Sequence, residues 1–190
     1  LAAFAIPTIL VTHDRAEAMS LADRIVVMDR GTIRQQGTVA EVFQTPRDLE
    51  VARIVGIETV AAGEVIERKE GLAIITVGAQ TLTAVAPEES WRLVHVCIKG
   101  EDVILQRSPG ADQSLRNLLP AKVTSLAPEG ALVRVGLDCG FELSALVTRP
   151  ACEELRLAKG EIVTAGVKAP SIHLIERRAS REDGTGSAPP

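Results

Sequence analysis

Aromatic side chains are nearly absent from this chain of 190 residues, which has one Trp, three Phe and no Tyr. The apolar content is therefore mainly Ala, Val, Leu and Ile, side chains that suit sheets and small barrels. The formal net charge at pH 7 is −4, and no basic stripe with interleaved aromatic residues is visible. A general nucleic-acid surface needs such a stripe, so we expect no nucleic-acid partner.

Long hydrophobic runs and paired cysteines are also missing. No apolar run approaches the roughly 20 residues that a membrane-spanning helix needs, and no signal peptide is recognisable. The three cysteines, Cys97, Cys139 and Cys152, are far apart and form no C-x-x-C pair. We interpret them as small buried residues in a reducing compartment rather than as metal ligands or disulfide partners. His95 and His173 lie in apolar, strand-like segments and are expected to be structural.

The most informative stretch that is present is residues 6–18. Residues 6–11 form an apolar, β-branched run, which predicts a buried strand of a parallel sheet. Asp14 is placed to cap a following helix, with Glu17 three residues later as the second half of a capping box. His13 would then lie at the carboxyl end of a strand and beside a helix, where open α/β sheets bind their ligands.

Further short elements follow as far as residue 57. Residues 24–28 and 32–36 read as two strands joined by a turn. Thr38 is placed as an N-cap with Glu41 three residues on, and a second short helix is expected over residues 48–54. We interpret this first region, residues 1–57, as the last part of an α/β nucleotide-binding domain.

This region resembles the ATP-binding subunits of ABC transporters. Thr12-His13-Asp14 is similar to their switch-histidine motif, Ala16-Glu17-Ala18 follows as in importer ATPases, and the similarity continues through residues 21–46. The resemblance implies that His13 is catalytic: it would contact the γ-phosphate of ATP and help to hold the attacking water. An imidazole can donate a hydrogen bond to a phosphoryl oxygen, which is the chemistry that this role requires.

Other motifs of that family are absent. The chain has no G-x-x-x-x-G-K-[ST] loop to surround phosphates with backbone N–H groups, no Leu-Ser-Gly-Gly-Gln signature, and no hydrophobic strand ending in an Asp-Glu pair to hold magnesium. The chain also begins without a methionine. We therefore expect the C-terminal part of a longer ATPase, which binds ATP and Mg²⁺ only as the full-length protein and does not hydrolyse ATP as this fragment.

From residue 59 the pattern changes to short alternating strands separated by turns. A helix is expected over residues 150–155, and residues 178–190 are expected to be a disordered tail. The two sets of strands are weakly alike, and we interpret them as a degenerate repeat of small OB-like barrels over residues 58–108 and 113–177. The expected strands are residues 61–67, 72–77, 80–85, 94–98 and 103–106 in the first set, and 117–126, 131–137, 142–148, 162–168 and 172–176 in the second.

The second set also resembles a known family. Ser114-Leu115-Arg116-Asn117 is similar to the Ser-Ala-Arg-Asn opening of molybdate-binding Mop-type domains, which are called TOBE domains where they follow importer ATPases. Val147-Thr148-Arg149 and Val167-Lys168-Ala169 occupy the later positions expected of such a domain. The predicted fold class is thus an α/β remnant of an ABC ATPase domain followed by all-β OB-like TOBE/Mop barrels.

A tetrahedral dianion needs several converging donors and a positive field. Ser114 and Asn117 offer side-chain donors, while Arg116 and Lys168 offer positive charge. We expect these four residues to bind an oxyanion. The alternative is that the two cations are solvated surface charges and Ser114 is a strand cap. Pro170 stands where family members often have serine, and it removes a backbone donor.

The resemblance implies the ATP-binding subunit of an ABC importer for molybdate or tungstate, with regulatory oxyanion-binding barrels. Such a subunit would lie at the cytoplasmic face of the membrane, dimerise, contact transmembrane permease subunits and serve an external binding protein indirectly. One alternative is a sugar, polyamine or sulfate importer whose barrels only regulate or dimerise. A second alternative is a stand-alone molybdate-binding protein, against which the ATPase-like residues 1–57 argue.

Overall fold

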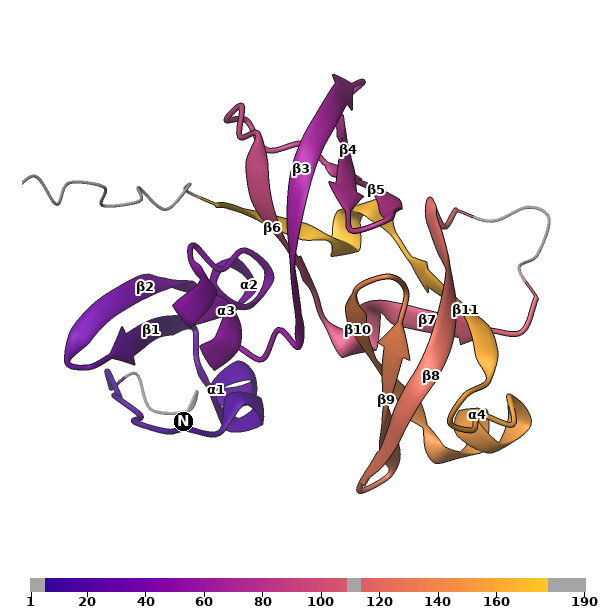
Figure 1. Ribbon diagram of the computed structural model, residues 1–190. Coiled ribbons are helices and arrows are strands. Elements are labelled where there is room, and N and C mark those ends of the chain that lie inside the picture. The colour runs from indigo at the N-terminus through magenta and orange to yellow at the C-terminus, as the bar shows by residue number, and fades with distance from the viewer. Residues whose placement is uncertain (1–5, 109–113, 178–190) are drawn as a thin grey trace, which may run out of the picture. The chain divides into compact units, whose positions relative to one another are not determined.

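The computed structural model describes residues 6–108 and 114–177 (Figure 1). The chain divides into two compact units, Leu1–Gly56 and Ile57–Pro190. No helix in the described ranges is long and apolar enough to cross a membrane.

Over residues 6–56, the first unit combines three short helices with a two-stranded antiparallel sheet. The turn between its strands contains Arg30 and Gly31 with φ of 48° and 78°. Positive φ at both central residues matches the turns that join tightly connected hairpins. The elements are α1 (Arg15–Leu21), β1 (Arg24–Asp29), β2 (Thr32–Thr38), α2 (Val39–Gln44) and α3 (Leu49–Ile54).

Side-chain caps begin the helices of this unit. Thr38 Oγ1 accepts from the backbone N–H of Glu41 at 3.2 Å, and Glu41 Oε2 accepts from the N–H of Thr38 at 2.7 Å, so the predicted capping box is complete. Asp14 caps α1 by accepting from the N–H of Glu17 at 3.1 Å. The second half of that predicted box is wrong, because the N–H of Asp14 donates to Thr12 Oγ1 instead.

The predicted buried strand at residues 6–11 is not formed. The structure assigns no strand there, and Ile9 and Val11 are each 92% exposed. A strand is stabilised by hydrogen bonds to a neighbour and by cover on its faces. Within residues 6–56 the two strands, β1 and β2, pair with each other and not with this segment. The α/β part of the predicted fold class therefore stays a prediction.

Over the described residues 57–108 and 114–177, the second unit consists of two antiparallel five-stranded sheets, which confirms the all-β, OB-like part of the predicted fold. Its strands agree with the predicted set to within a few residues at each end. The strands are β3 (Thr59–Lys69), β4 (Leu72–Val77), β5 (Gln80–Val85), β6 (Leu93–Ile98), β7 (Val103–Gln106), β8 (Asn117–Glu129), β9 (Leu132–Asp138), β10 (Glu142–Thr148), β11 (Ile162–Val167) and β12 (His173–Glu176). The helices are α4 (Arg149–Glu154) and two 3₁₀ turns, η1 (Gly100–Asp102) and η2 (Ala169–Ser171).

Each half of this unit gives its last strand to the other half. The strand orders are β12-β6-β3-β4-β5 and β10-β9-β8-β11-β7. Strand β7 ends the first half in sequence but pairs with β11 of the second, and β12 pairs with β6 of the first (Figure 1). The sequential ranges 58–108 and 113–177 therefore do not correspond to two separate sheets.

The two halves are related by an internal repeat that can be followed residue by residue. The long first strands carry matching bulges, between Val65 and Glu67 in β3 and between Val123 and Ser125 in β8. Val65 and Val123, the residues before the two bulges, are therefore equivalent. Six residues earlier in each strand, Thr59 corresponds to Asn117. The preceding residues, Glu58 and Arg116, then correspond as well. At the far strand, Thr59 pairs with Ile98 and Asn117 pairs with Val167, so Lys99 corresponds to Lys168.

The alternating burial of the strands produces one apolar core shared by both sheets. It includes Ile75, Leu82, Val135 and Leu137, all nearly inaccessible to solvent. Burying each such side chain is worth roughly 1.5–3 kcal/mol. Cys139 belongs to the same core, and its burial raises the pKa of the thiol to about 12. It therefore behaves as a small apolar residue, as predicted.

Candidate functional site

The predicted catalytic residue, His13, lies immediately before α1 with its side chain exposed. Asp14 Oδ1 caps the helix by accepting from the N–H of Glu17, and the N–H of Asp14 donates to Thr12 Oγ1, so local hydrogen bonds hold the backbone beside the imidazole. This agrees with a histidine presented at the start of a helix. Its predicted contact with ATP is a property of a nucleotide complex and stays a prediction.

The structure brings three of the four predicted oxyanion ligands, Arg116, Asn117 and Lys168, to one end of a strand pair. Asn117 and Val167 are the last registered pair of β8 and β11, which are antiparallel. Arg116 directly precedes Asn117 and Lys168 directly follows Val167, so the two cations lie side by side where the pair ends. Both residues are exposed. Adjacent strands are about 4.8 Å apart, so the backbones of Arg116 and Lys168 lie close together and this end of the sheet carries two exposed basic side chains.

Asn117 has a different environment from its neighbours, because only 2% of its surface is exposed. Its Nδ2 donates to the carbonyls of Thr83 at 2.9 Å and Val167 at 3.0 Å, and its Oδ1 accepts from the N–H of Thr83 at 2.6 Å. Both amide hydrogens are therefore used. The side chain joins β5 of one sheet to β11 of the other and holds the strand end that carries Arg116 and Lys168.

The loop after Lys168 is shaped by the η2 turn. The N–H of Ser171 donates to the carbonyl of Lys168 at 3.0 Å, and Pro170, which is exposed, has no N–H. These two residues consequently offer no free backbone donor. Ser114, the fourth predicted ligand, is exposed and lies three residues before Asn117, the first residue of β8. An anion here would depend mainly on side-chain donors.

The same bridge recurs at the equivalent place in the other half. Thr59 is 2% exposed, and its Oγ1 accepts from the N–H of Ser144 at 3.0 Å. Ser144 is the counterpart of Thr83. Thr83 follows Leu82, which pairs with Ile75, and Ser144 follows Leu143, which pairs with Leu137 at the equivalent position of the repeat. This bridge makes one bond where Asn117 makes three. This equivalence was not predicted from the sequence, although an alignment of the repeat on Lys99 and Lys168 indicates it.

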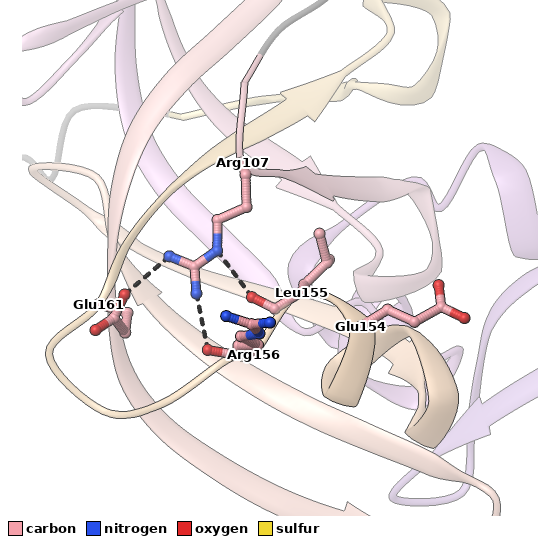
Figure 2. A pocket seen from close by; sticks show the side chains of 5 residues that line it. All are labelled: Arg107, Glu154, Leu155, Arg156 and Glu161. Atoms are coloured by element: carbon pink, nitrogen blue, oxygen red, sulfur yellow. Dashed lines mark hydrogen bonds and ion pairs between the residues drawn. The ribbon is translucent and has the colours of Figure 1, made fainter.

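A separate open pocket of about 520 Å³ lies between the end of β7 and α4 (Figure 2). Figure 2 shows Arg107 directed at the C-terminal end of α4, where it donates to the carbonyls of Leu155 and Arg156 and to Glu161 Oε2, each at 2.8 Å. The guanidinium thus caps the helix and anchors the exchanged strand. All three bonds of the Arg107 guanidinium are made within the pocket lining, which indicates a structural junction.

Metal chemistry has no support in the described part of the chain. No group of three or more His, Cys, Asp or Glu side chains there could hold a metal ion. The candidate site is therefore the positively charged strand end with Ser114, Arg116 and Lys168, positioned by Asn117.

Comparison with known proteins identifies related chains. The TOBE domain family matches residues 113–174. A molybdate/tungstate import ATP-binding protein of Pyrococcus horikoshii is 38% identical over 172 residues, covering 90% of this chain and 48% of that protein. A molybdenum import ATP-binding protein of Rhodopseudomonas palustris is 30% identical over 192 residues, covering 97% of this chain and 51% of that protein.

Other relatives include a sulfate/thiosulfate import ATP-binding protein of Chromobacterium violaceum, which is 32% identical and covers 92% of this chain and 47% of that protein. A solved structure with the same fold is the cytoplasmic molybdate-binding protein ModG with molybdate bound. It has a TM-score of 0.55 and 24% identity, and the match covers 63% of this chain and 96% of that chain. The chain spans about half the length of the curated relatives it matches. Residues 113–174 thus match the TOBE domain family, and the chain is homologous to the C-terminal region of the ATP-binding subunits of molybdate/tungstate ABC importers over about half of their length.

Proposed function

We propose that this chain is the C-terminal part of the ATP-binding subunit of an ABC importer, and that its second unit binds the transported oxyanion as a regulatory ligand. The observation that carries the proposal is the strand end of the TOBE domain, where Arg116 and Lys168 lie side by side. Molybdate or tungstate is the proposed ligand. The relatives named for import of these anions support the choice.

The proposed contacts follow from charge and reach. Arg116 offers a fork of N–H donors that matches two oxygens of a tetrahedral anion, and Lys168 offers a point charge with three donors. The Ser114 hydroxyl completes the set from the segment before β8. Asn117 acts as a positioning residue, because its amide is bonded to the backbone of β5 and β11.

Sulfate is the second candidate ligand, and one relative named for sulfate and thiosulfate import favours it. Sulfate is smaller than molybdate but has the same shape and charge. Donors on flexible side chains adapt to either size, whereas a rigid backbone cradle would select one. Because Pro170 and Ser171 provide no free backbone donor, we expect weaker size discrimination than a backbone cradle would give.

For the full-length protein we propose the remaining functions of such a subunit. It would hydrolyse ATP with Mg²⁺, using His13 at the γ-phosphate, and would pair with a second copy of itself. It would contact transmembrane permease subunits at the cytoplasmic face of the membrane and serve an external binding protein through them. Replacing His13 by Ala should then reduce turnover roughly 100-fold or more, as expected when one preorganised donor to a transferring phosphoryl group is lost.

The oxyanion proposal is tested by calorimetry on the whole chain with molybdate, tungstate and sulfate. The whole chain is needed because β7 completes the sheet that contains the TOBE strands. Lys122→Ala is a matched control, since Lys122 is exposed and lies on β8 at the opposite end of its pairing with β11. Binding that survives in Lys122→Ala and weakens in Lys168→Ala supports the site. Absence of binding to all three anions would contradict it.

A further inference from the structure

The internal repeat places a carboxylate where the oxyanion site has its arginine. Glu58 corresponds to Arg116, and Lys99 corresponds to Lys168, because the matching strand registers align these pairs. The two positions thus share a lysine, a 3₁₀ turn after it and a buried side-chain bridge. They differ in the sign of the charge on the residue before β3 and β8.

The Glu58 carboxylate has the contacts that a bound anion would make. Its Oε2 accepts from the backbone N–H of Gly100 at 2.9 Å, and its Oε1 accepts from Arg134 Nη1 at 3.0 Å. The same guanidinium nitrogen is 3.5 Å from Ser144 Oγ. The Glu58 side chain is 26% exposed and that of Arg134 31%, so both groups are largely withdrawn from water.

Other charges around this position explain why a free anion would not enter it beside Glu58. Glu129 holds the other edge of the Arg134 guanidinium through bonds of 2.6 and 2.9 Å. Glu101 lies 3.6 Å from the Lys99 ammonium. Burial raises the pKa of Asp102, and the nearby charges of Glu101 and Glu58 raise it further, against the opposite effects of Lys99 and a hydrogen bond with Ser171. Acidic groups therefore balance both cations.

We propose that Glu58 occupies the counterpart of the oxyanion site as a built-in anion, so that each chain binds one oxyanion and not two. The proposal rests on the proposed function for the identity of the open site. The closed position is a latent site for a small tetrahedral oxyanion, with donors from Gly100, Arg134 and Ser144 and with Lys99 alongside. Removing the Glu58 carboxylate opens it.

The test is the number of molybdate ions bound per chain, measured by calorimetry and equilibrium dialysis. We expect one in the unmodified chain and two in Glu58→Ala. In Lys168→Ala we expect the single site to bind roughly 10- to 150-fold more weakly, so that its occupancy falls at a concentration that just saturates the unmodified chain. In the double variant Glu58→Ala/Lys168→Ala we expect one site that still fills at that concentration, the latent one. Circular dichroism establishes that each variant is folded.

Glu129→Ala is the matched control. It removes a carboxylate from the same guanidinium and leaves the Glu58 contact with Gly100 in place, so binding should stay at one. A second ion in Glu129→Ala would overturn the proposal, because the gain would then come from freeing Arg134 alone. Binding of two molybdate ions by the unmodified chain would also overturn the proposal, because the latent site would then be open with Glu58 in place.

The two proposals fail in different ways. If the unmodified chain binds one ion and folded Glu58→Ala also binds one, the latent site is wrong and the open site stands. If the unmodified chain binds none and Glu58→Ala binds one, the open site is wrong and the latent site stands.

Discussion

The two halves of the second unit share one topology and carry opposite charges at one pair of equivalent positions. Arg116 directly precedes β8 and is exposed, whereas Glu58 directly precedes β3 and its carboxylate is bonded to Gly100 and Arg134. Both halves keep the lysine at the end of the neighbouring strand, Lys99 after β6 and Lys168 after β11. The comparison indicates that the repeated fold supplies the place for a ligand, and that one side chain decides whether the place is open.

The largest effect is expected from breaking the strand exchange. A chain that ends after Ile172 lacks β12, and with it the buried side chains of Leu174 and Ile175 and the pairing with β6. The two side chains alone are worth about 3–6 kcal/mol. We expect a large fall in the thermal midpoint, measured by circular dichroism, relative to a control chain that ends after Arg177. Equal midpoints would contradict an essential role of the exchange.

The next effect compares the two bridges. Asn117→Ala leaves three backbone groups of Thr83 and Val167 without a partner, and we expect a loss of about 3 kcal/mol or more. Thr59→Ala leaves the N–H of Ser144 without its hydrogen-bond partner and should lower the free energy of unfolding by about 1–2 kcal/mol. Urea unfolding at equilibrium measures both. Equal losses of unfolding free energy in the two variants would contradict the difference that the numbers of hydrogen bonds in the two bridges indicate.

A third prediction separates the two equivalent lysines. Lys168→Ala should weaken molybdate binding roughly 10- to 150-fold, the range for losing a hydrogen bond to a charged group. Lys99→Ala should change it less than about twofold, because a single lost surface-type ion pair has a small effect. Titration calorimetry at fixed ionic strength measures both constants. Equal losses would place the ligand between the halves rather than at the Lys168 end.

The smallest effect concerns Asp102 and pH. Its pKa is raised in the folded chain, mainly by burial, so the folded state favours the protonated carboxyl. The stability associated with that proton is present at low pH and is lost as pH rises through the folded pKa. Asp102→Asn should therefore raise the unfolding midpoint slightly at pH 7 relative to the unmodified chain, with the difference shrinking as pH falls and vanishing only below the ordinary carboxyl pKa of 3.8. A difference that grows on acidification would contradict this sign.

Local patterns were sufficient to predict the strands of the second unit. Alternation and turn residues are local, so residues 103–106 and 172–176 were both correctly expected to be strands. The same patterns could not show which sheet each strand joins, because that depends on pairing between distant segments. Residues 6–11 illustrate the limit: an apolar β-branched run indicates strand propensity, but the strand forms only where a partner is paired with it.

The candidate site could also be predicted only as far as its residue types, and not its contacts between distant segments. Charge and hydrogen-bonding type are visible in a sequence, so Arg116 and Lys168 could be selected, and the structure brings them to one strand end. The use of both Asn117 hydrogens by carbonyl groups is a tertiary fact that composition does not contain. The carboxylate of Glu58 could not be selected either, because its partners Gly100 and Arg134 are far away in sequence.

The strand exchange also has a consequence for synthesis on the ribosome. The sheet that starts with Thr59–Lys69 receives its edge strand only from His173–Glu176, so it stays incomplete until more than a hundred later residues have been translated. Folds dominated by contacts between distant segments form slowly, because loop closure precedes the stabilising contacts. During that interval the open edge of β6 is available to wrong partners. Nascent chains of this protein should therefore depend on chaperones more than chains whose two barrels each close from their own sequence.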